Sequence, residues 1–565
     1  MSTNDGAGQS PFEGDLRKGS NAVAAGILVS RLAGLAREIA MARLLGVGVG
    51  VEAFKAAMRV PNLLQNLLGE GVLSASFVPV YSRMIAEGRR QQARELAAAV
   101  LGLLLSVTVA IVVVVVIFAR PVTRVLAWGF IEGSDRFELT VTLVRIVTPG
   151  IGILVVSAWC LAILNAHRRF FLSYVAPALW NFAIITAIVG ASIAGLTDTD
   201  VATAMAIGAL VGSALQLLIQ VPAIVRLHGS ISPRLSLHTE GLHTVVRRFG
   251  QVLAGRGSVQ LAGYVDLVAA SFLAAGAIAA IGYAQVLYLL PIGLFGMSVA
   301  ASELPALSTM DHSDRDRVAQ RLEGGLSRVA FFILPTTVAF VVLGDLVVAA
   351  VLSGGRFGGD ASLQVGMVLA AYSLGLPASA SSRLLQSVLY GIGDAATPAR
   401  SAAVRVVIAA GVGIMLMLPL DAFAVIAGSI ERIMPATLTI ASAAERASSE
   451  SLLRLGAAGL ALGASVGAWV EWWLLRRAVR RRVKPVRMLG TRGSRLLIAA
   501  LIATTAALAT RHLPFLAEAT PRMQGLVAML LVGMLYVAAC RALRVPEADE
   551  LTDAWLSIVR SRRLR

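Results

Sequence analysis

Long apolar segments alternate with short polar ones along almost the whole chain. The segment 96–119 is the clearest, because it holds no charged residue and contains the valine run Val112–Val116. A helix needs about 20 apolar residues to cross a bilayer, and the apolar windows predict fourteen such spans. The stretch 420–452 is apolar in part and could hold a short helix of its own. The predicted spans are 21–45, 53–82, 96–119, 141–165, 171–195, 201–225, 248–274, 279–308, 327–353, 364–392, 397–418, 454–476, 494–511 and 523–543.

Composition agrees with this pattern and narrows the class of protein. Of the 565 residues, 57% are hydrophobic and 15% are charged, and the mean hydropathy is +0.77. Soluble proteins carry about 25% charged residues. The chain is therefore an all-α polytopic membrane protein, and a soluble enzyme, a disordered chain and a disulfide-stapled domain are excluded. Cys160 and Cys540 lie in apolar runs, where we expect small packed side chains.

The net charge of +17 is distributed in a way that predicts orientation. Basic residues collect in every second loop except the short one between the tenth and eleventh spans, most densely between 476 and 487, and basic loops face the cytoplasm. Both termini are then cytoplasmic and the number of spans is even. Residues 1–20 form a cytoplasmic segment that lacks the apolar core of a cleavable signal. Residues 544–565 form a cytoplasmic amphipathic tail, which we expect on an anionic lipid surface; a solvated tail is the alternative.

Short matches at a nearly constant separation indicate an internal duplication. Leu32–Gly34 recurs as Leu261–Gly263, the segment 77–82 recurs as 303–308, and Pro177 matches Pro398. Each half contains six spans, an even number, so both halves begin on the same side of the membrane and the repeats are parallel. We therefore expect two six-helix lobes related by a pseudo-two-fold axis, followed by two C-terminal helices. The predicted boundaries are 21–228 for the first lobe, 245–478 for the second with its 420–452 insertion, and 494–543 for the final pair.

Ionisable residues inside the predicted spans are candidates for function, because each costs a few kcal/mol at bilayer depth. Arg31 and Glu38 share a face of the first span, while Arg37 lies about 100° from Glu38. The alternative is that such charges pair only to fix helix packing. Arg43 and Lys55, near span ends, are expected to reach the interface. The other candidates are Glu52, Arg59, Asn62 and Glu70 in the second span, and Arg256 and Asp266 in the seventh.

Buried arginines point to an anionic group, because guanidinium presents a rigid fork that matches phosphate oxygens. No enzyme constellation competes with this interpretation. The sequence contains no HExxH motif, no glycine-rich phosphate loop and no Ser/His/Asp set at membrane depth. We therefore expect a protein that is not an enzyme.

Several blocks carry a specific family resemblance: Ser30–Glu38, Glu52–Phe54, Arg59–Leu64 and Gly69–Pro79. They resemble the MurJ/MviN family of bacterial lipid II flippases, within the multidrug/oligosaccharidyl-lipid/polysaccharide exporter superfamily. The resemblance extends to Asn165, Ala176-Pro177, Tyr283-Ala284 and Thr397-Pro398. It implies a multi-pass protein of the bacterial cytoplasmic (inner) membrane with a cavity between two lobes. It also implies movement of the undecaprenyl-diphosphate-linked peptidoglycan precursor to the outer leaflet, and cell-wall synthesis machinery as a partner.

The resemblance also assigns roles by position. Arg31 and Arg37 match the family's cavity arginines, and Glu38 and Glu52 stand where the family usually has Asp. Asp266 matches a position that binds sodium in some relatives, although Gly413 and Met417 stand at the partner ligand positions. Two family arginines are replaced, by Gln65 and Val286, and Arg59 or Arg256 could restore the charge. The expected substrate-binding set is Arg31, Arg37, Glu38, Glu52, Arg59, Asn62, Glu70 and Arg256, with sodium or another monovalent cation as a possible coupling ion.

The leading hypothesis is flipping by alternating access, with the diphosphate on Arg31 and Arg37 and the polyprenyl tail in lipid. Rival transporters would export another lipid-linked saccharide or cationic drugs, but an arginine-lined cavity disfavours cations. A glycosyltransferase or phosphatase would need acidic metal ligands or a histidine nucleophile at a membrane face. A non-transporting scaffold of the cell-wall machinery would tolerate loss of the cavity charges.

Overall fold

The computed structural model describes residues 11–167, 169–229, 232–296, 315–440, 442, 452–483, 492–513 and 519–550. Within this range the chain is almost entirely helical and divides into two compact units. Unit 1 contains Met1–Leu44 and Val49–Tyr264, and unit 2 contains Leu45–Gly48 and Val265–Arg565. The repeat segment 303–308 and the amphipathic tail from 551 onward lie outside the described residues, as do residues 1–10.

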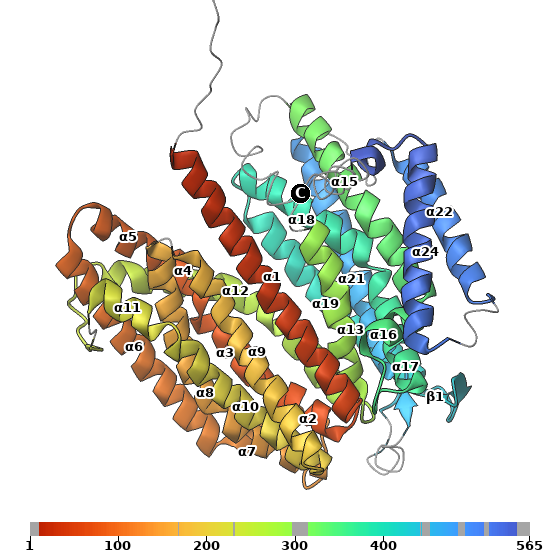
Figure 1. Cartoon of the computed structure of the whole chain (residues 1–565), viewed down its shortest axis with the longest axis horizontal. Helices are drawn as coiled ribbons and strands as arrows, with labels where there is room; N and C mark the ends of the chain where they lie inside the picture. The colour runs from red at the N-terminus through yellow and green to blue at the C-terminus, as the bar shows by residue number, and fades with distance from the viewer. Residues whose placement is uncertain are drawn as a thin grey trace, which may run out of the picture. The chain divides into compact units, whose positions relative to one another are not determined.

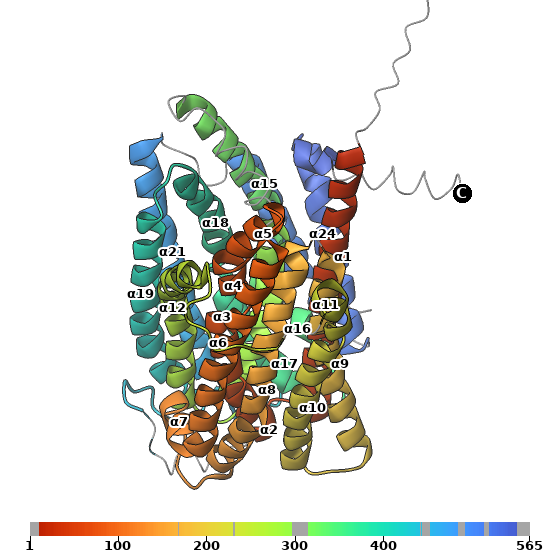
Figure 2. The same ribbon diagram turned by 90° about the vertical axis from the view of Figure 1, so that its left-hand side faces the viewer.

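Unit 1 is built around one long helix, α8, which contains 32 residues. It contacts α2, α3, α4, α6, α7 and α10, and its buried face includes Trp159, whose indole Nε1–H donates to the carbonyl of Ala97 at 3.1 Å. Figures 1 and 2 both show α6 beside α8 and α9 beside α10. The helices are α1 (Pro11–Leu45), α2 (Val49–Ala57), α3 (Arg59–Leu68), α4 (Glu70–Ser76), α5 (Val78–Ala86), α6 (Arg90–Ile117), α7 (Ala119–Leu126), α8 (Asp135–Ala166), α9 (Phe170–Ile193), α10 (Asp198–Leu218), α11 (Val221–His228) and α12 (Leu242–Ser271), the last of which continues into unit 2.

The predicted second span, 53–82, is a helix broken into the four pieces α2 to α5. The breaks fall at Met58, Gly69 and Phe77. Pro61 and Pro79 each stand within the first three residues of a new piece, where the missing N–H of proline costs nothing. Gly69 adopts an extended backbone, and a Cβ there would lie 2.1 Å from the carbonyl oxygen of Gln65. Two of the three interruptions therefore lie beside a proline, and the third lies at Gly69.

Unit 2 contains a close helix pair that depends on glycine. Helices α19 and α21 approach so closely that a Cβ at Gly459 or Gly463 would lie 2.4 Å from the α19 backbone, at Met417 and Gly413. Small residues permit such close contact between membrane helices. The helices of unit 2 are α13 (Ala277–Pro291), the π-helix η1 (Ile292–Gly296), α15 (Arg315–Val342), α16 (Gly344–Leu352), α17 (Gly359–Ser373), α18 (Leu376–Gly391), α19 (Ala396–Leu420), α21 (Gly456–Arg482), α22 (Gly493–Thr510) and α24 (Pro521–Ala542).

In its described residues, 420–440, 442 and 452, the insertion contains strands, and the short helix that the sequence suggested does not occur among them. Strands β1 (Phe423–Ile426), β2 (Ser429–Arg432) and β3 (Leu453–Arg454) form an antiparallel sheet in the order β2-β1-β3. The turn Ala427-Gly428 has positive φ at both residues, the geometry of a tight hairpin. Arg454 of β3 pairs with Asp421 at 3.0 Å in a buried site. The apolar strand β1 is partly buried, whereas β2 is exposed.

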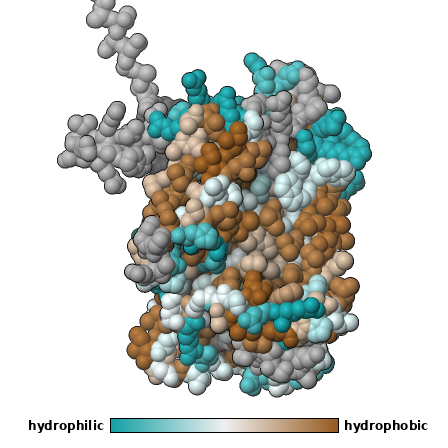
Figure 3. All heavy atoms as spheres, turned by 90° about the vertical axis from the view of Figure 1, so that its right-hand side faces the viewer, coloured by the Kyte–Doolittle hydropathy of each residue, from teal (hydrophilic) through white to brown (hydrophobic). Residues whose placement is uncertain are grey.

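Eleven helices among the described residues are long and apolar enough to cross a membrane, or twelve if α17 and α18, bent by 42°, form one span. Helices α1 and α12, with 35 and 30 residues, carry charges and fall outside this set. The number fourteen therefore stays a prediction. Figure 3 views the side of α22 and α24, where hydrophobic areas lie between hydrophilic ones. On these two helices Leu501 and Leu530 are exposed. Such exposed apolar side chains suit contact with lipid.

Candidate functional site

Three helices of unit 1 bring a charged cluster together inside the unit. Glu38 of α1 is buried, and its two oxygens each accept one cation. Oε1 accepts from Nη2 of Arg37, and Oε2 accepts from Nζ of Lys55 on α2, both at 2.7 Å. Arg37 also donates from Nη1 to Oδ1 of Asn181 on α9 at 3.1 Å. These contacts fix the Arg37 guanidinium on two sides.

The neighbouring residues of α9 orient this arginine. Asn181 donates its own Nδ2 to the carbonyl of Pro177, which turns Oδ1 toward Arg37. The Arg37 guanidinium also lies 5.1 Å from the centroid of the Trp180 ring, within cation–π range. Arg37 is therefore held by an acid, an amide and an aromatic ring, and its side chain remains 20% exposed.

The trio Arg37, Glu38 and Lys55 carries one more positive charge than negative. Arg59, at the start of α3, lies close enough to Lys55 for the two charges to repel each other. A Cβ on Gly263 of α12 would lie 3.3 Å from Nη1 of Arg59, so the absence of a side chain at 263 leaves room for this guanidinium. Such a surplus of positive charge in an apolar span favours an anion as ligand.

Helix α3 exposes polar side chains beside this cluster in sequence. Asn62, Gln65 and Asn66 recur at helical spacing and are all exposed, whereas Pro61 and Leu68 are buried. Glu70, at the start of α4, is half-buried. Exposed amides on a predicted membrane span are typical of a helix face that meets water or a polar substrate.

The remaining predicted residues are placed differently. Arg31 is exposed on α1, two turns before Arg37. Glu52 is fully buried on α2 and forms an ion pair of 3.1 Å with Arg136 of α8, whose guanidinium lies 3.9 Å from the Phe130 ring centroid. Glu52 therefore holds α2 against α8. Arg256 belongs to α12, but its side chain lies outside the described part of the structure.

Sequence reasoning missed several members of this site. Lys55 was expected at the interface, yet its side chain is 13% exposed and pairs with Glu38. Lys55 lies on α2, which ends at Ala57, one residue before the break at Met58. Asn181 follows Pro177 by four residues, and this spacing of an amide after a proline is the signal that could have found it. Arg136 lies outside the predicted spans, so it was not considered.

In unit 2, Asp266 belongs to a group whose charges are already balanced by arginines. Arg405 of α19 pairs with the buried Glu471 of α21 at 2.8 Å, and Gln386 donates to the same carboxylate at 2.9 Å. Asp266 lies within electrostatic reach of Arg405. The positive charges of Arg383 and Arg405 both interact electrostatically with the hydroxyl group of Tyr288 on α13. Asp266 therefore faces a fixed guanidinium.

The residues present do not fit a sodium ion at Asp266. The positions predicted for partner ligands, Gly413 and Met417, are buried and pack against Gly463 and Gly459 of α21. No group of three or more His, Cys, Asp or Glu side chains able to hold a metal occurs in the described ranges. The positive charge of Arg405, which pairs with Glu471, also reaches Asp266 and disfavours a second cation there. The sodium site stays a prediction that this geometry disfavours.

Comparison with known proteins agrees with the geometry of both units. The family model "Lipid II flippase MurJ" matches residues 41–442. A probable lipid II flippase MurJ of Rhizobium tropici is 31% identical over 394 residues, covering 69% of this chain and 73% of that protein. The lipid II flippase MurJ of Burkholderia cenocepacia is 31% identical over 386 residues, covering 66% and 73%.

Solved structures show the same fold. The inward closed conformation of a lipid II flippase MurJ superposes with a TM-score of 0.72 at 21% identity, covering 92% of this chain and 99% of that one. An inward-facing multidrug resistance transporter of the MATE family in the MOP superfamily gives a TM-score of 0.59 at 15% identity, covering 80% and 94%. With the family model and the curated relatives, these similarities show that the chain belongs to the lipid II flippase MurJ family.

Proposed function

We propose that this chain moves lipid II, the diphosphate-linked peptidoglycan precursor, from the inner to the outer leaflet of the bacterial cytoplasmic membrane by alternating access. Family membership supports the substrate, and the charge surplus of Arg37, Glu38 and Lys55 supports the chemistry. Both termini would lie in the cytoplasm, and enzymes that consume lipid II outside would be the partners. The observation that carries the proposal is that two partly buried cations share one buried carboxylate in unit 1.

The geometry suggests how an anionic headgroup is held. A diphosphate that leaves water loses a large solvation energy unless charged donors replace it. Arg37 offers a planar fork and Lys55 offers a compact ammonium, and both are held by Glu38 without substrate. An arriving phosphate oxygen competes with Glu38 for these donors. Glu38 then takes the place of the phosphate when the lipid leaves, so that Arg37 and Lys55 keep an acceptor and release of the lipid is reversible.

The remaining predicted residues contribute in different ways: some would contact the headgroup and one positions a helix. Arg31 is exposed on the same helix and is suited to meeting the headgroup first. Arg59 adds positive charge beside Lys55, and Asn62 and Glu70 offer neutral and acidic hydrogen-bonding groups to the sugar-peptide part. Glu52 is committed to Arg136 and acts by positioning α2.

The proposal is tested by rescue of a flippase-depleted bacterium, with external accessibility of lipid II as the readout. Arg37→Ala removes the charge surplus and should abolish outward lipid II, while Arg37→Lys should retain part of the transport. Arg83→Ala is the matched control, because the Arg83 side chain is 81% exposed. Among the contacts described for it, Arg83 pairs only with Glu87, one helical turn further along α5. Membrane levels of each variant are measured by immunoblot.

The outcomes separate the rival functions. Loss of both growth and outward lipid II in Arg37→Ala, with normal Arg83→Ala, supports flipping through this cluster. Growth of Arg37→Ala without outward lipid II would favour a scaffold. Outward movement of a different lipid-linked saccharide by the wild type, without lipid II, would assign the export of that lipid.

A further inference from the structure

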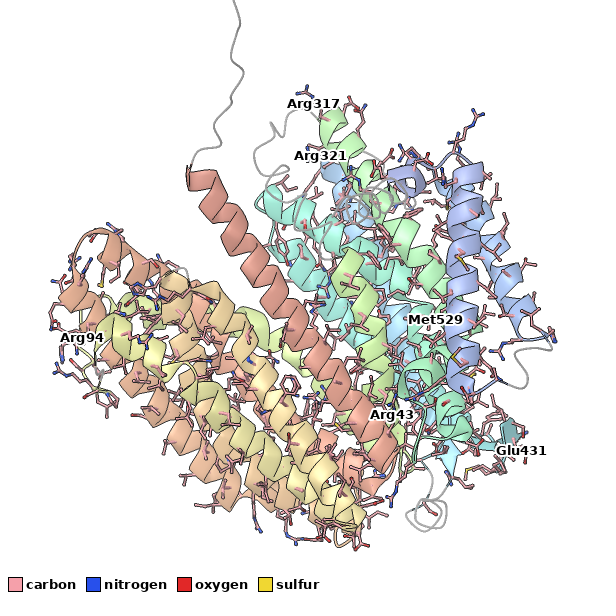
Figure 4. The ribbon with its side chains drawn as sticks, in the orientation of Figure 1. Arg43, Arg94, Arg317, Arg321, Glu431 and Met529 are labelled. Atoms are coloured by element: carbon pink, nitrogen blue, oxygen red, sulfur yellow. The ribbon has the colours of Figure 1, made fainter. Side chains whose placement is uncertain are left out.

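Unit 2 contains a cavity that the proposed transport pathway does not use. Its volume is about 620 Å³, within the range of small-molecule pockets. The walls come from α16, the loop between α16 and α17, the turn of the β1–β2 hairpin at Gly428, and the residues flanking α22 and α24. Figure 4 shows Arg317 and Arg321 of α15 at one end of unit 2 and Glu431 of the hairpin at the other. The cavity thus lies at the hairpin end.

Two arginines line the cavity, and they differ in how they are paired. Arg511 donates from Nη2 to Oδ1 of Asp345 and to the carbonyl oxygen of Val342, each at 2.6 Å. Arg522, in the first turn of α24, has buried Nε and Nη2 atoms with no hydrogen-bond partner among the residues that the structure describes. Asp345, Arg511 and Arg522 are the charged lining residues, so the described wall carries one net positive charge.

An unpartnered buried guanidinium is costly, and this cost implies a ligand that brings acceptors. If Arg522 only stabilised packing, a carboxylate of the protein could neutralise it, as Asp345 neutralises Arg511. Arg522 also lines a cavity of about 620 Å³, which is large enough for a headgroup. An anionic ligand in this cavity would bring the acceptors that the described residues do not supply.

Glycines supply the second wall of the site. Gly358 is the N-cap of α17, a helix of 15 residues, and Gly359 is its first residue. A Cβ at either glycine would meet nothing within 4 Å, so their backbone borders open space. The N–H groups of a first helical turn lack partners inside the helix and attract anions. Asp360, in the same turn, is engaged by the Gly428 N–H at 2.7 Å.

We propose that this cavity binds a phosphate group, with Arg522 as its main donor and Arg511 and the start of α17 as supports. Guanidinium forks and helix N-termini both match phosphate oxygens. In the orientation proposed above, the hairpin end faces the outer side, opposite the basic loops. A phospholipid headgroup of the outer leaflet or a soluble phosphate ester can supply this chemistry. The site is independent of the Arg37 cluster in unit 1.

The test uses the purified full-length chain in a neutral detergent, with binding followed by isothermal titration calorimetry. The probes are inorganic phosphate, short-chain phosphatidylglycerol and zwitterionic short-chain phosphatidylcholine. Arg522→Gln removes the donor. Gly358→Leu fills the cavity without changing charge and at an ordinary φ of −84°. Arg541→Gln is the matched control, because Arg541 lies on the same helix, in its last turn, and pairs with Asp549.

We expect phosphatidylglycerol to bind to the wild type. Its affinity should be about tenfold or more weaker in Arg522→Gln and Gly358→Leu, the loss typical of a charge-assisted hydrogen bond. The affinity of Arg541→Gln should equal that of the wild type. Ligand-free Arg522→Gln should unfold at a temperature no lower than the wild type, because no hydrogen bond to Nε or Nη2 is lost. Binding of inorganic phosphate with the same variant pattern assigns a soluble phosphate ester, and binding of the lipid alone assigns a headgroup. Equal affinity of wild type and Arg522→Gln, or no binding by the wild type, would overturn the proposal.

Discussion

Glu38→Gln is the substitution that most directly tests the charge balance of unit 1. The carboxylate is 7% exposed and lies 2.7 Å from both Arg37 and Lys55. Glutamine keeps the shape but leaves two partly buried cations without a counter-charge. The formal charge of the trio rises by one, and the two cations repel each other. Uncompensated charge in a buried pair costs about 3–5 kcal/mol, and we expect a loss of stability in that range.

A second substitution separates charge balance from lost hydrogen bonds. Adding Lys55→Met to Glu38→Gln removes one cation, so the formal charge of the trio returns to the wild-type value. Arg37 keeps its bond to Asn181 and its position beside Trp180. If charge balance dominates, the double variant should recover more than half of the lost stability, a coupling that a double-mutant cycle measures.

The assay is equilibrium unfolding of the purified chain in detergent, with lipid II accessibility in depleted cells as the functional readout. Glu87→Gln is the matched control, because Glu87 also pairs with two arginines, Arg83 and Arg89, but on the exposed surface. Exposed pairs contribute little, and its stability should not change measurably. A Glu38→Gln variant as stable as wild type, or a double variant less stable than the single one, would refute the reasoning.

Further predictions concern other parts of the molecule. Burial, with the charges of Arg169 and Arg90, lowers the pKa of His167, whose Nε2 lies 3.0 Å from the Tyr81 hydroxyl. As the pH falls, the unfolded chain therefore takes up a proton at His167 before the folded chain does. The free energy of unfolding should then decrease below about pH 6.5. His167→Gln should make the melting temperature depend less on pH between about pH 8 and about pH 5. Gly463→Ala should cost about 1–3 kcal/mol in denaturant unfolding through overpacking at the α19–α21 contact; an unchanged midpoint would contradict the close contact. Transport in sodium-free choline buffer should match transport in sodium buffer, because the positive charge of Arg405 reaches Asp266 and disfavours a second cation there.

The fold was accessible from the sequence wherever hydrophobicity decides it. Apolar segments predicted most of the helices, because a long apolar run has few alternatives to a membrane span. The insertion at 420–452 was not predicted, because its short apolar runs suit a strand or a helix equally and only the Ala427-Gly428 turn distinguishes them. The break at Leu343 between α15 and α16 was also missed, because the apolar run continues across it and Gly344 alone does not distinguish a break from a continuous helix.

The candidate site was accessible only where residue type alone indicates function. Arg37 and Glu38 stand inside an apolar helix, and this position by itself marks them. Lys55 and Asn181 were missed because their role depends on which helices become neighbours, which hydropathy does not encode. Glu52 shows the converse limit: its sequence context matches that of a substrate residue, but its partner Arg136 comes from a helix far along the chain.

The two units differ in charge balance at membrane depth, and this difference bears on the replaced family arginines. In unit 2 the described group contains Arg383 and Arg405 against Asp266 and Glu471, so its charges cancel. A phosphate there would have to displace a carboxylate without a net gain in attraction. In unit 1, Lys55 brings a second cation to Glu38 and leaves a surplus. If unit 1 holds the diphosphate as proposed, we expect Lys55 of α2 to supply the positive charge that is absent at Gln65, because Arg405 in unit 2 is already paired with Glu471.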